Sequence, residues 1–386
     1  MSVSSAPVTA LPTIPVMRPW LGEEEAAAAA EAVASGWVAQ GPRVAAFEEA
    51  FARRVGATEA VAVSNCTTAL HLALHLLGVG PGDEVVVPSF SFIATANVVR
   101  HVGAEPVFAD VDLVTGNLTP ATVAEVLTPR TRAVIVVHQA GVPADTVALG
   151  ALLEPRGIAV VEDAACAIGS TLHGRPVGEG AQLAAFSFHP RKLVTTGEGG
   201  MLVTPSAEVA ARARRLREHG MSVSAAERHA SGSVTPEQYL EPGFNFRMTD
   251  VQAAIGLVQL TRLDAMVARR RERADRYREL LAGLPGARLV EDPPWGTTNY
   301  QSCWLLLPED APVGRDALLG RLSAAGISAR RGIMAAHLEP AYADRPRVSL
   351  PATERLTADS LVLPVFHQMT DADQDRVVDA LLAALR

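Results

Sequence analysis

Between residues 58 and 204, seven short apolar runs alternate with segments of helical periodicity, and this alternation constrains the fold more than any other feature. The runs are rich in valine, isoleucine and alanine and carry few polar residues on either face, as strands covered on both sides do. They comprise residues 60–63, 84–87, 106–108, 133–137, 158–162, 183–188 and 201–204. Helices are predicted between them, over residues 67–77 and 94–102 for example. The pattern predicts an α/β fold with a mostly parallel sheet between helices.

The chain has 386 residues, more than one hydrophobic core usually supports, and its character changes near residue 250. A proline-punctuated arm over residues 1–21 precedes a helix over 22–35, which begins with three glutamates. Long helices are predicted over 249–260 and 263–281, with further helices near 315–325 and from Asp371. We therefore predict an N-terminal arm (1–21), a large domain (22–250) and a smaller C-terminal α+β domain (251–386).

The charge balance argues against nucleic acid as a partner. There are 34 basic and 42 acidic residues, which gives a formal net charge of −8, and such a surface repels a phosphate backbone. An arginine-rich run over residues 269–273 is interleaved with acidic residues, so it is predicted to be a solvated helix face.

The cysteines and the apolar runs bear on the compartment. Cys66, Cys166 and Cys303 lie far apart, in odd number and without zinc-ligand spacing, so neither a disulfide framework nor a metal site is indicated. No apolar run is long enough to span a bilayer, and the first residues do not have the pattern of a secretory signal. We expect a cytoplasmic protein without membrane association.

Parallel sheets present their ligands at the carboxyl ends of the strands, where this sequence places polar residues. Residues 64–68 (SNCTT) follow the first strand and begin a helix, which suits a phosphate group, although a plain helix cap would explain them equally. Asp163 ends a buried strand, and a buried carboxylate requires a cation or several donors, unless it only caps a helix.

Two further strand ends carry groups of a different kind. Lys192 lies between an aromatic strand and the glycine-rich turn at residues 195–200, where burial is expected to lower its pKa and leave an amine able to attack a carbonyl; a surface lysine is the alternative. Residues 88–92 (PSFSF) carry two phenylalanines, one of which could cover a flat cofactor instead of joining the core.

Taken together, these groups predict a site for pyridoxal 5′-phosphate (PLP). They provide a phosphate cup, an aromatic lid, a carboxylate that keeps the pyridine nitrogen protonated, and a lysine that holds the aldehyde as a Schiff base. No Gly-x-Gly-x-x-Gly motif follows the first strand and no Walker lysine is present, so dinucleotide and ATP sites have little support.

The same motifs resemble those of the DegT/DnrJ/EryC1/StrS family of aminotransferases. The likeness runs from about residue 14 to residue 385. Its motifs are residues 186–192 (FSFHPRK), 196–200 (TGEGG), 162–165 (EDAA), 81–85 (PGDEV) and 243–248 (GFNFRM). The resemblance implies the fold-type I aminotransferase architecture, a homodimer with sites at the subunit interface, and amination of a nucleotide-linked keto sugar with glutamate as the expected amino donor.

The resemblance also implies roles for single residues. Lys192 would be the Schiff-base lysine and proton shuttle, and Asp163 would pair with the pyridine nitrogen. Phe92 would stack on the ring. The phosphate would be held by Cys66, Thr67, Ser187 and, from the neighbouring subunit, Asn245.

Two positions depart from the family pattern. Cys66 stands where glycine is common, which bears on how closely the backbone approaches the phosphate. Cys166 stands where many members have glutamine or histidine near the 3-oxygen of the cofactor. A thiol is a weak donor, so that contact would be absent or made by water, and a simple buried apolar role for Cys166 is equally consistent.

The substrate is less constrained than the chemistry. Trp37 and His337 are candidate substrate contacts by resemblance, and each would serve equally well as a structural side chain. A dehydratase branch of the family has histidine in place of the lysine, so Lys192 favours transamination. The alternatives are an aminotransferase for a keto-cyclitol and a non-catalytic regulator that has kept the fold.

Overall fold

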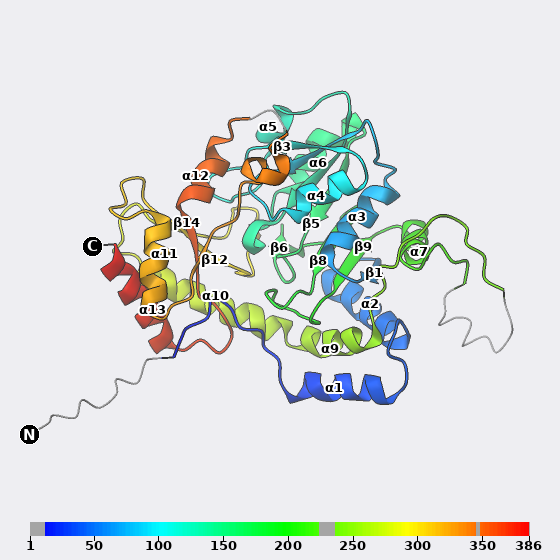
Figure 1. Cartoon of the computed structure of the whole chain (residues 1–386), viewed down its shortest axis with the longest axis horizontal. Helices are drawn as coiled ribbons and strands as arrows, with labels where there is room; N and C mark the ends of the chain where they lie inside the picture. The colour runs from blue at the N-terminus through cyan, green and yellow to red at the C-terminus, as the bar shows by residue number, and fades with distance from the viewer. Residues whose placement is uncertain (1–11, 224–235, 345–347, 386) are drawn as a thin grey trace, which may run out of the picture.

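A seven-stranded sheet lies at the centre of the molecule in the computed structural model, which describes residues 12–223, 236–344 and 348–385 (Figure 1). The strand order is β1-β9-β8-β5-β4-β2-β3. The strands are β1 (Glu59–Val63), β2 (Glu84–Pro88), β3 (Glu105–Ala109), β4 (Thr131–Val137), β5 (Ala159–Asp163), β8 (Leu183–Ser187) and β9 (Gly200–Thr204). All seven predicted strands are therefore present.

The sheet is mostly parallel, which confirms the predicted α/β class. Strands β3, β2, β4, β5 and β8 pair in parallel, and β9 runs antiparallel to both of its neighbours, β8 and β1. Successive side chains of a strand point to opposite faces, so both faces must find apolar cover. In β2, Val85 and Val87 join the core with α3, α4 and α7, whereas Val86 packs into the core on the other face.

Helices cover both faces of the sheet (Figure 1). Those of the first two-thirds of the chain are α1 (Glu23–Ala34), α2 (Pro42–Val55), α3 (Cys66–Leu76), α4 (Ala94–His101), α5 (Pro120–Ala124), α6 (Thr146–Leu153), α7 (Ala207–Leu216) and α9 (Asp250–Thr261). The remaining helices are α10 (Leu263–Leu280), α11 (Arg315–Ala324), α12 (Pro351–Asp359) and α13 (Asp371–Ala384). Among the described residues, none of the helices is long and apolar enough to cross a membrane.

A second, antiparallel sheet lies in the C-terminal part of the chain. Its order is β10-β12-β14-β13, and a third small sheet has the order β11-β6-β7. The strands are β10 (Arg288–Leu289), β12 (Cys303–Leu306), β13 (Arg330–Arg331), β14 (Ser360–Leu363), β11 (Gly296–Thr297), β6 (Thr171–Leu172) and β7 (Arg175–Pro176). The predicted domain boundary falls where α9 begins, and α9 packs on α1 and α2.

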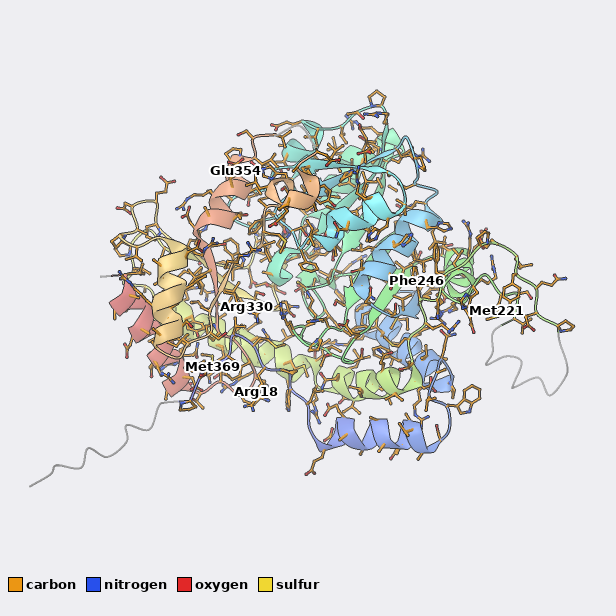
Figure 2. All side chains as sticks on the ribbon, in the orientation of Figure 1. Arg18, Met221, Phe246, Arg330, Glu354 and Met369 are labelled. Atoms are coloured by element: carbon orange, nitrogen blue, oxygen red, sulfur yellow. The ribbon has the colours of Figure 1, made fainter. Side chains whose placement is uncertain are left out.

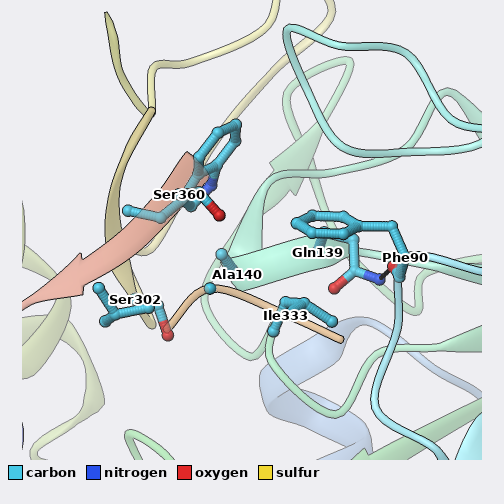
Figure 3. A pocket seen from close by; sticks show the side chains of 9 residues that line it. Phe90, Gln139, Ala140, Ser302, Ile333 and Ser360 are labelled. Atoms are coloured by element: carbon cyan, nitrogen blue, oxygen red, sulfur yellow. Dashed lines mark hydrogen bonds between the residues drawn. The ribbon is translucent and has the colours of Figure 1, made fainter. Parts of the chain in front are cut away.

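The two larger sheets share one continuous apolar core. It includes Val134 of β4 and Leu149 of α6 together with Trp304 of β12 and Leu361 of β14. A small pocket lies at this junction, and Figure 3 shows Phe90 and Gln139 on one side of it with Ser302 and Ser360 on the other. The C-terminal part of the chain is therefore fixed against the strand ends that carry the predicted chemistry.

One prediction about α10 is wrong for two of its four arginines between residues 269 and 273. The arginine-rich run was expected to be a solvated face, but Arg270 and Arg273 are 4% and 2% exposed. Arg270 donates to the carbonyl oxygens of Tyr300 and Gln301, and Arg273 donates to Gln374. A guanidinium group has five N–H donors, so it can be buried where irregular main chain leaves carbonyl groups to be satisfied.

Candidate active site

Lys192 lies in the loop between β8 and β9, and the main chain folds this loop tightly. The carbonyl oxygen of Phe188 accepts from Thr196 N at 3.0 Å and from Thr195 Oγ1 at 2.9 Å. Lys192 N donates to His189 O at 2.8 Å. The loop therefore holds the half-buried lysine in place, and its Nζ donates to Cys166 Sγ at 3.1 Å.

The composition gives a further indication about this residue. Of the 34 basic side chains in the chain, Lys192 is the single lysine and all the others are arginine. A guanidinium group stays charged at any physiological pH, whereas an amine can lose its proton and act as a nucleophile or a base. The one position that keeps an amine thus lies where such chemistry is predicted. The composition therefore marks Lys192 in the sequence independently of the motifs.

Asp163 ends strand β5 and is 5% exposed. Its Oδ2 accepts from Thr95 Oγ1 at 2.8 Å, and its Oδ1 accepts from Ala165 N at 3.2 Å. Thr95 lies in α4, so its part in the site is visible only once the fold brings α4 against β5. Motif analysis missed it because a threonine inside a helix gives no signal of its own.

Asp163 and Lys192 influence each other's protonation. Burial raises the pKa of Asp163 above its ordinary value, although the hydrogen bonds from Thr95 and Ala165 and the charge of Lys192 oppose this. Burial lowers the pKa of Lys192, but the groups around the amine, Cys166 first and Asp163 among them, outweigh burial and raise that pKa above its ordinary value. The predicted lowering of the Lys192 pKa is therefore wrong for the protein without cofactor, because polar sulfur and oxygen groups surround the amine.

The N-terminus of α3 lies beside this pair. Asn65 caps the helix by accepting from Thr68 N at 2.9 Å, and Thr68 Oγ1 in turn accepts from Asn65 N. The hydroxyl of Thr67 has no hydrogen-bond partner among the described residues, so it is not needed for the cap. A side chain at Gly200 would lie 2.6 Å from Cys66 N, so only glycine permits this approach of β9 to α3.

Cys66, the first residue of α3, is buried, and its Sγ lies 4.0 Å from Asp163 Oδ1. Burial, reinforced by the Asp163 charge, raises the pKa of its thiol well above the ordinary value. The side chain therefore stays neutral next to the carboxylate. The structure thus brings four of the predicted residues into one cluster: Lys192, Asp163, Cys66 and Cys166.

Comparison with known proteins decides the family. The model of the DegT/DnrJ/EryC1/StrS aminotransferase family matches residues 19–382. The chain belongs to this family. It is therefore an aminotransferase that depends on PLP.

Solved structures of aminotransferases resemble the chain over nearly its whole length. The aminotransferase TlmJ from Streptoalloteichus hindustanus is 41% identical, with 96% of this chain and 98% of that one covered and a TM-score of 0.89. DesV from S. venezuelae, in complex with a ketimine intermediate, is 35% identical (97% and 100% covered, TM-score 0.87). DesI, in the presence of its TDP-sugar product, is also 35% identical (97% and 93% covered, TM-score 0.87).

The groups at the strand ends of this family member fit the cofactor. Asp163 offers a buried anion for a protonated ring nitrogen, and the amine of Lys192 suits an aldehyde. The start of α3, with the unpartnered hydroxyl of Thr67, suits a phosphate group. Among the described residues, no cluster of three or more histidine, cysteine or acidic side chains could hold a metal ion.

Phe92 and Ser187 lie at the ends of two strands of the aminotransferase. Phe92 follows β2 and is 63% exposed, which is unusual for a phenylalanine, whereas Phe90 nearby is buried in the core. Ser187 ends β8 and is 9% exposed, and its Oγ accepts from His189 N at 3.4 Å. The exposed ring of Phe92 is thus the one available to cover a flat ligand, while Ser187 lies in the strand that leads to Lys192.

Asn245 lies in an extended segment that pairs with Glu218 through a β-bridge. Its neighbours Phe244 and Phe246 stack on each other, with ring centroids 4.7 Å apart, and both contact His71 of α3. Figure 2 shows Phe246 beside α7. Asn245 itself is exposed, so in the single subunit its amide remains accessible.

Trp37 and His337 are held by structural contacts in this chain. Trp37 is half-buried in the connection between α1 and α2, where its ring closes over Gly41. His337 is 8% exposed, and its Nδ1 lies 2.6 Å from Ser89 Oγ at the end of β2. Its Nε2 lies 3.6 Å from Oε1 of Glu354, a residue of α12 that is labelled in Figure 2. A substrate role for either residue stays a prediction.

Proposed function

We propose that this aminotransferase moves an amino group from an amino acid, with glutamate as the expected donor, to a keto sugar carried on a nucleotide. The observation that carries this proposal is that the single lysine of the chain and a buried aspartate follow or end neighbouring strands, β8 and β5, close enough to shift each other's pKa. The likeness to DesI, whose structure contains a TDP-sugar product, supports the substrate class.

The residues of the chain would share the work as follows. PLP, when bound, supplies an electron sink and carries the amino group between the two half-reactions. Lys192 would hold the cofactor covalently and, once released, move a proton to and from the reacting carbon with Nζ. Asp163, oriented by Thr95 and Ala165 N, would keep the positive charge on the ring nitrogen.

The remaining predicted residues would position the cofactor. Thr67, Ser187 and the first N–H groups of α3, with Cys66 among them, would bind the phosphate, and Phe92 would cover the ring. Cys166 would lie beside Lys192, near the 3-oxygen. We also propose a homodimer in which Asn245 of the partner subunit completes the phosphate site, and the exposure of Asn245 supports this.

The test uses two variants of the lysine. Lys192→Ala and Lys192→Arg should each reduce turnover with glutamate and a nucleotide-linked keto sugar by at least about 10³-fold, because neither side chain can link to the cofactor. Turnover and the absorbance of the linked cofactor are measured together. Full turnover in the alanine variant would refute the proposal.

A shared site is tested by mixing two inactive variants. Lys192→Ala and Asn245→Ala subunits should regain activity when they are co-refolded or co-expressed, because one site of each mixed dimer then contains both native residues. Each variant assayed alone is the control. If the mixture is no more active than its components, Asn245 does not act across a subunit interface.

A second candidate substrate class has one observation in its favour. The structure of 3-amino-5-hydroxybenzoic acid synthase is 30% identical to this chain, covers 97% of it and has a TM-score of 0.87. A carbocyclic ketone such as a keto-cyclitol is therefore the alternative. Parallel assays with nucleotide-linked keto sugars and inosose-type ketones, both with glutamate as donor, would separate the two.

A further inference from the structure

Gln301 bonds to the main chain on both sides of Lys192. Its Oε1 accepts from Leu193 N at 2.9 Å, and its Nε2 donates to Arg191 O at 2.5 Å. Gln301 is 6% exposed and lies just before β12, more than 100 residues further along the chain. One side-chain amide from the C-terminal part of the protein thus holds the two residues adjacent to the single lysine.

Cys166, which accepts from Lys192 Nζ, is held by the same short segment, residues 299–301. Asn299 Nδ2 donates to Cys166 O and to Ile168 O, each at 2.8 Å, and Asn299 Oδ1 accepts from Gln301 N at 2.8 Å. Residues 299–301 therefore fix the main chain of Lys192 through Gln301 and that of Cys166 through Asn299. The 3.1 Å contact between Lys192 Nζ and Cys166 Sγ therefore depends on the position of this one segment.

The segment itself is rigidly supported. Arg270 donates to Tyr300 O and Gln301 O, both at 3.0 Å, and among the described residues no carboxylate forms an ion pair with it. Burial lowers the pKa of Arg270 to about 10. The protein therefore buries a guanidinium group chiefly to satisfy these carbonyl oxygens.

Two backbone features show how closely the segment is fitted. Tyr300 has a φ of +50°, a conformation that residues other than glycine rarely adopt, and its side chain is 1% exposed. A side chain at Gly141 would lie 1.9 Å from Asn299 Oδ1, and Ser302 N donates to Ala140 O beside the pocket in Figure 3. Backbone strain of this kind persists where the surroundings impose it, and it is frequent at functional sites.

We propose that Gln301 is a positioning residue for amino transfer, which holds Lys192 Nζ at the place where it meets the cofactor and substrate. This inference rests on the proposed role of Lys192. To bridge Leu193 N and Arg191 O, a side chain needs one acceptor and one donor in the same planar group. Among long side chains only glutamine provides both. An ionised glutamate could accept from Leu193 N but could not donate to Arg191 O, and methionine could not donate and is only a weak acceptor.

Two Gln301 variants of the loaded enzyme test the proposal, and Gln374→Met is the matched control. Gln374 is also buried, accepts from Arg273 Nη1 at 2.7 Å and donates to Arg273 O at 2.8 Å, but it lies in α13. Gln301→Met should lower kcat about 10- to 100-fold, because a displacement of about 1 Å can cost that much, and leave KM for the keto sugar unchanged. It should also shift the pH midpoint at which the absorbance of the lysine-linked cofactor changes. Gln374→Met should do neither.

Gln301→Glu gives an independent arm that does not depend on the stability of the methionine variant. Its kcat should approach the wild-type value as the pH falls, because a protonated carboxyl group can donate to Arg191 O again. The proposal would be overturned if Gln301→Met had the wild-type kcat and an unshifted absorbance midpoint. It would also be overturned if kcat of Gln301→Glu varied with pH in parallel with kcat of the wild type. Lys192→Ala is measured alongside: if it retains turnover, the role of Lys192 itself is wrong, whatever the Gln301 variants do.

Discussion

The protonation of Lys192 depends on a thiol. Cys166 Sγ accepts from Lys192 Nζ at 3.1 Å, and Cys166 is the first of the groups that raise the pKa of this amine against the effect of burial. An amine must lose its proton before it can attack a carbonyl, so Cys166 affects how readily the protein takes up its cofactor.

We therefore expect Cys166→Ala to lower the pKa of Lys192 in the protein without cofactor. The pH dependence of labelling by an amine-selective reagent measures this, because Lys192 is the only lysine and the N-terminal amine titrates well below it. The labelling rate of the variant should rise at lower pH than that of the wild type, whereas Cys303→Ala, which removes a buried thiol of β12 that does not affect the pKa of Lys192, should not move the profile. Superimposable profiles for wild type and Cys166→Ala would contradict this.

The carboxylate of Asp163 is costly to the protein without cofactor. Burial raises its pKa, so between the unfolded and folded pKa values the folded chain binds more protons, and stability falls as the pH rises through that range. Asp163→Asn should stabilise the cofactor-free protein at pH 7 by about 1 kcal/mol, the usual size of such gains, while amino transfer is lost.

The pH dependence makes this prediction specific. The difference in unfolding free energy between Asp163→Asn and wild type should shrink as the pH is lowered towards about 4, the ordinary pKa of aspartate. Denaturant unfolding at several pH values measures it. With PLP bound the order of stability should reverse, because the variant lacks the charge that pairs with the ring nitrogen. A difference independent of pH would show that burial of the charge is not the cause.

The sequence predicts the chemical groups of this site better than it predicts the residues that hold these groups in position. Lys192 and Asp163 could be found because each follows a buried strand, where ligands of parallel sheets lie. Thr95, Asn299 and Gln301 could not, since their partners are main-chain or carboxylate groups that only the fold brings near. The pKa of Lys192 was mispredicted for the same reason: burial can be expected from sequence, but the 3.1 Å contact between Lys192 Nζ and Cys166 Sγ cannot.

At the level of secondary structure, one aspartate ties two helices together. Asp250, the first residue of α9, is fully buried and accepts from three N–H groups at the start of α2, those of Gly41, Arg43 and Val44. The N-terminal N–H groups of a helix have no partner within the helix, and the helix dipole favours a negative charge there. The side chain that caps α2 is thus supplied by a residue more than 200 positions away in sequence.

Asp250→Ala should therefore destabilise the protein by about 2–4 kcal/mol, because it leaves buried donors unsatisfied in place of charge-assisted hydrogen bonds. Asp264→Ala is the control, since Asp264 is exposed near the start of α10. Chemical denaturation of both variants provides the measurement. Equal stability of Asp250→Ala and the wild type would mean that water replaces the carboxylate at this helix start.

Individual elements differ in how well the sequence predicts them. All seven strands of the main sheet could be predicted, because their apolar residues face helices on both sides. Helix α2 was not predicted, although Val44, Phe47, Phe51 and Val55 have helical spacing and are all buried. The burial of Arg270 and Arg273 could not be predicted, since their acceptors lie in other segments.

At the scale of the whole molecule, the replacement of surface lysine by arginine has a chemical consequence. Ion pairs throughout the described structure use arginine or histidine as the cation, for example Arg214 with Glu48 and Glu59, and Arg276 with Asp375. Arginine stays protonated and does not react with amine-selective reagents under mild conditions. Such a reagent can therefore react only with Lys192 and the N-terminal amine.

Treatment of the cofactor-free protein with an amine-selective reagent should modify one side chain per subunit, at Lys192. Recovery of activity on addition of PLP should fall in proportion to that modification, because Lys192 is the single lysine and the folded surface is left intact. Peptide mass spectrometry measures the extent of modification, and Lys192→Arg, labelled at the N-terminus alone, is the control. PLP added first should protect Lys192 but not the N-terminal amine. Full recovery of activity after complete modification of Lys192 would mean that this amine is not the group that binds the cofactor.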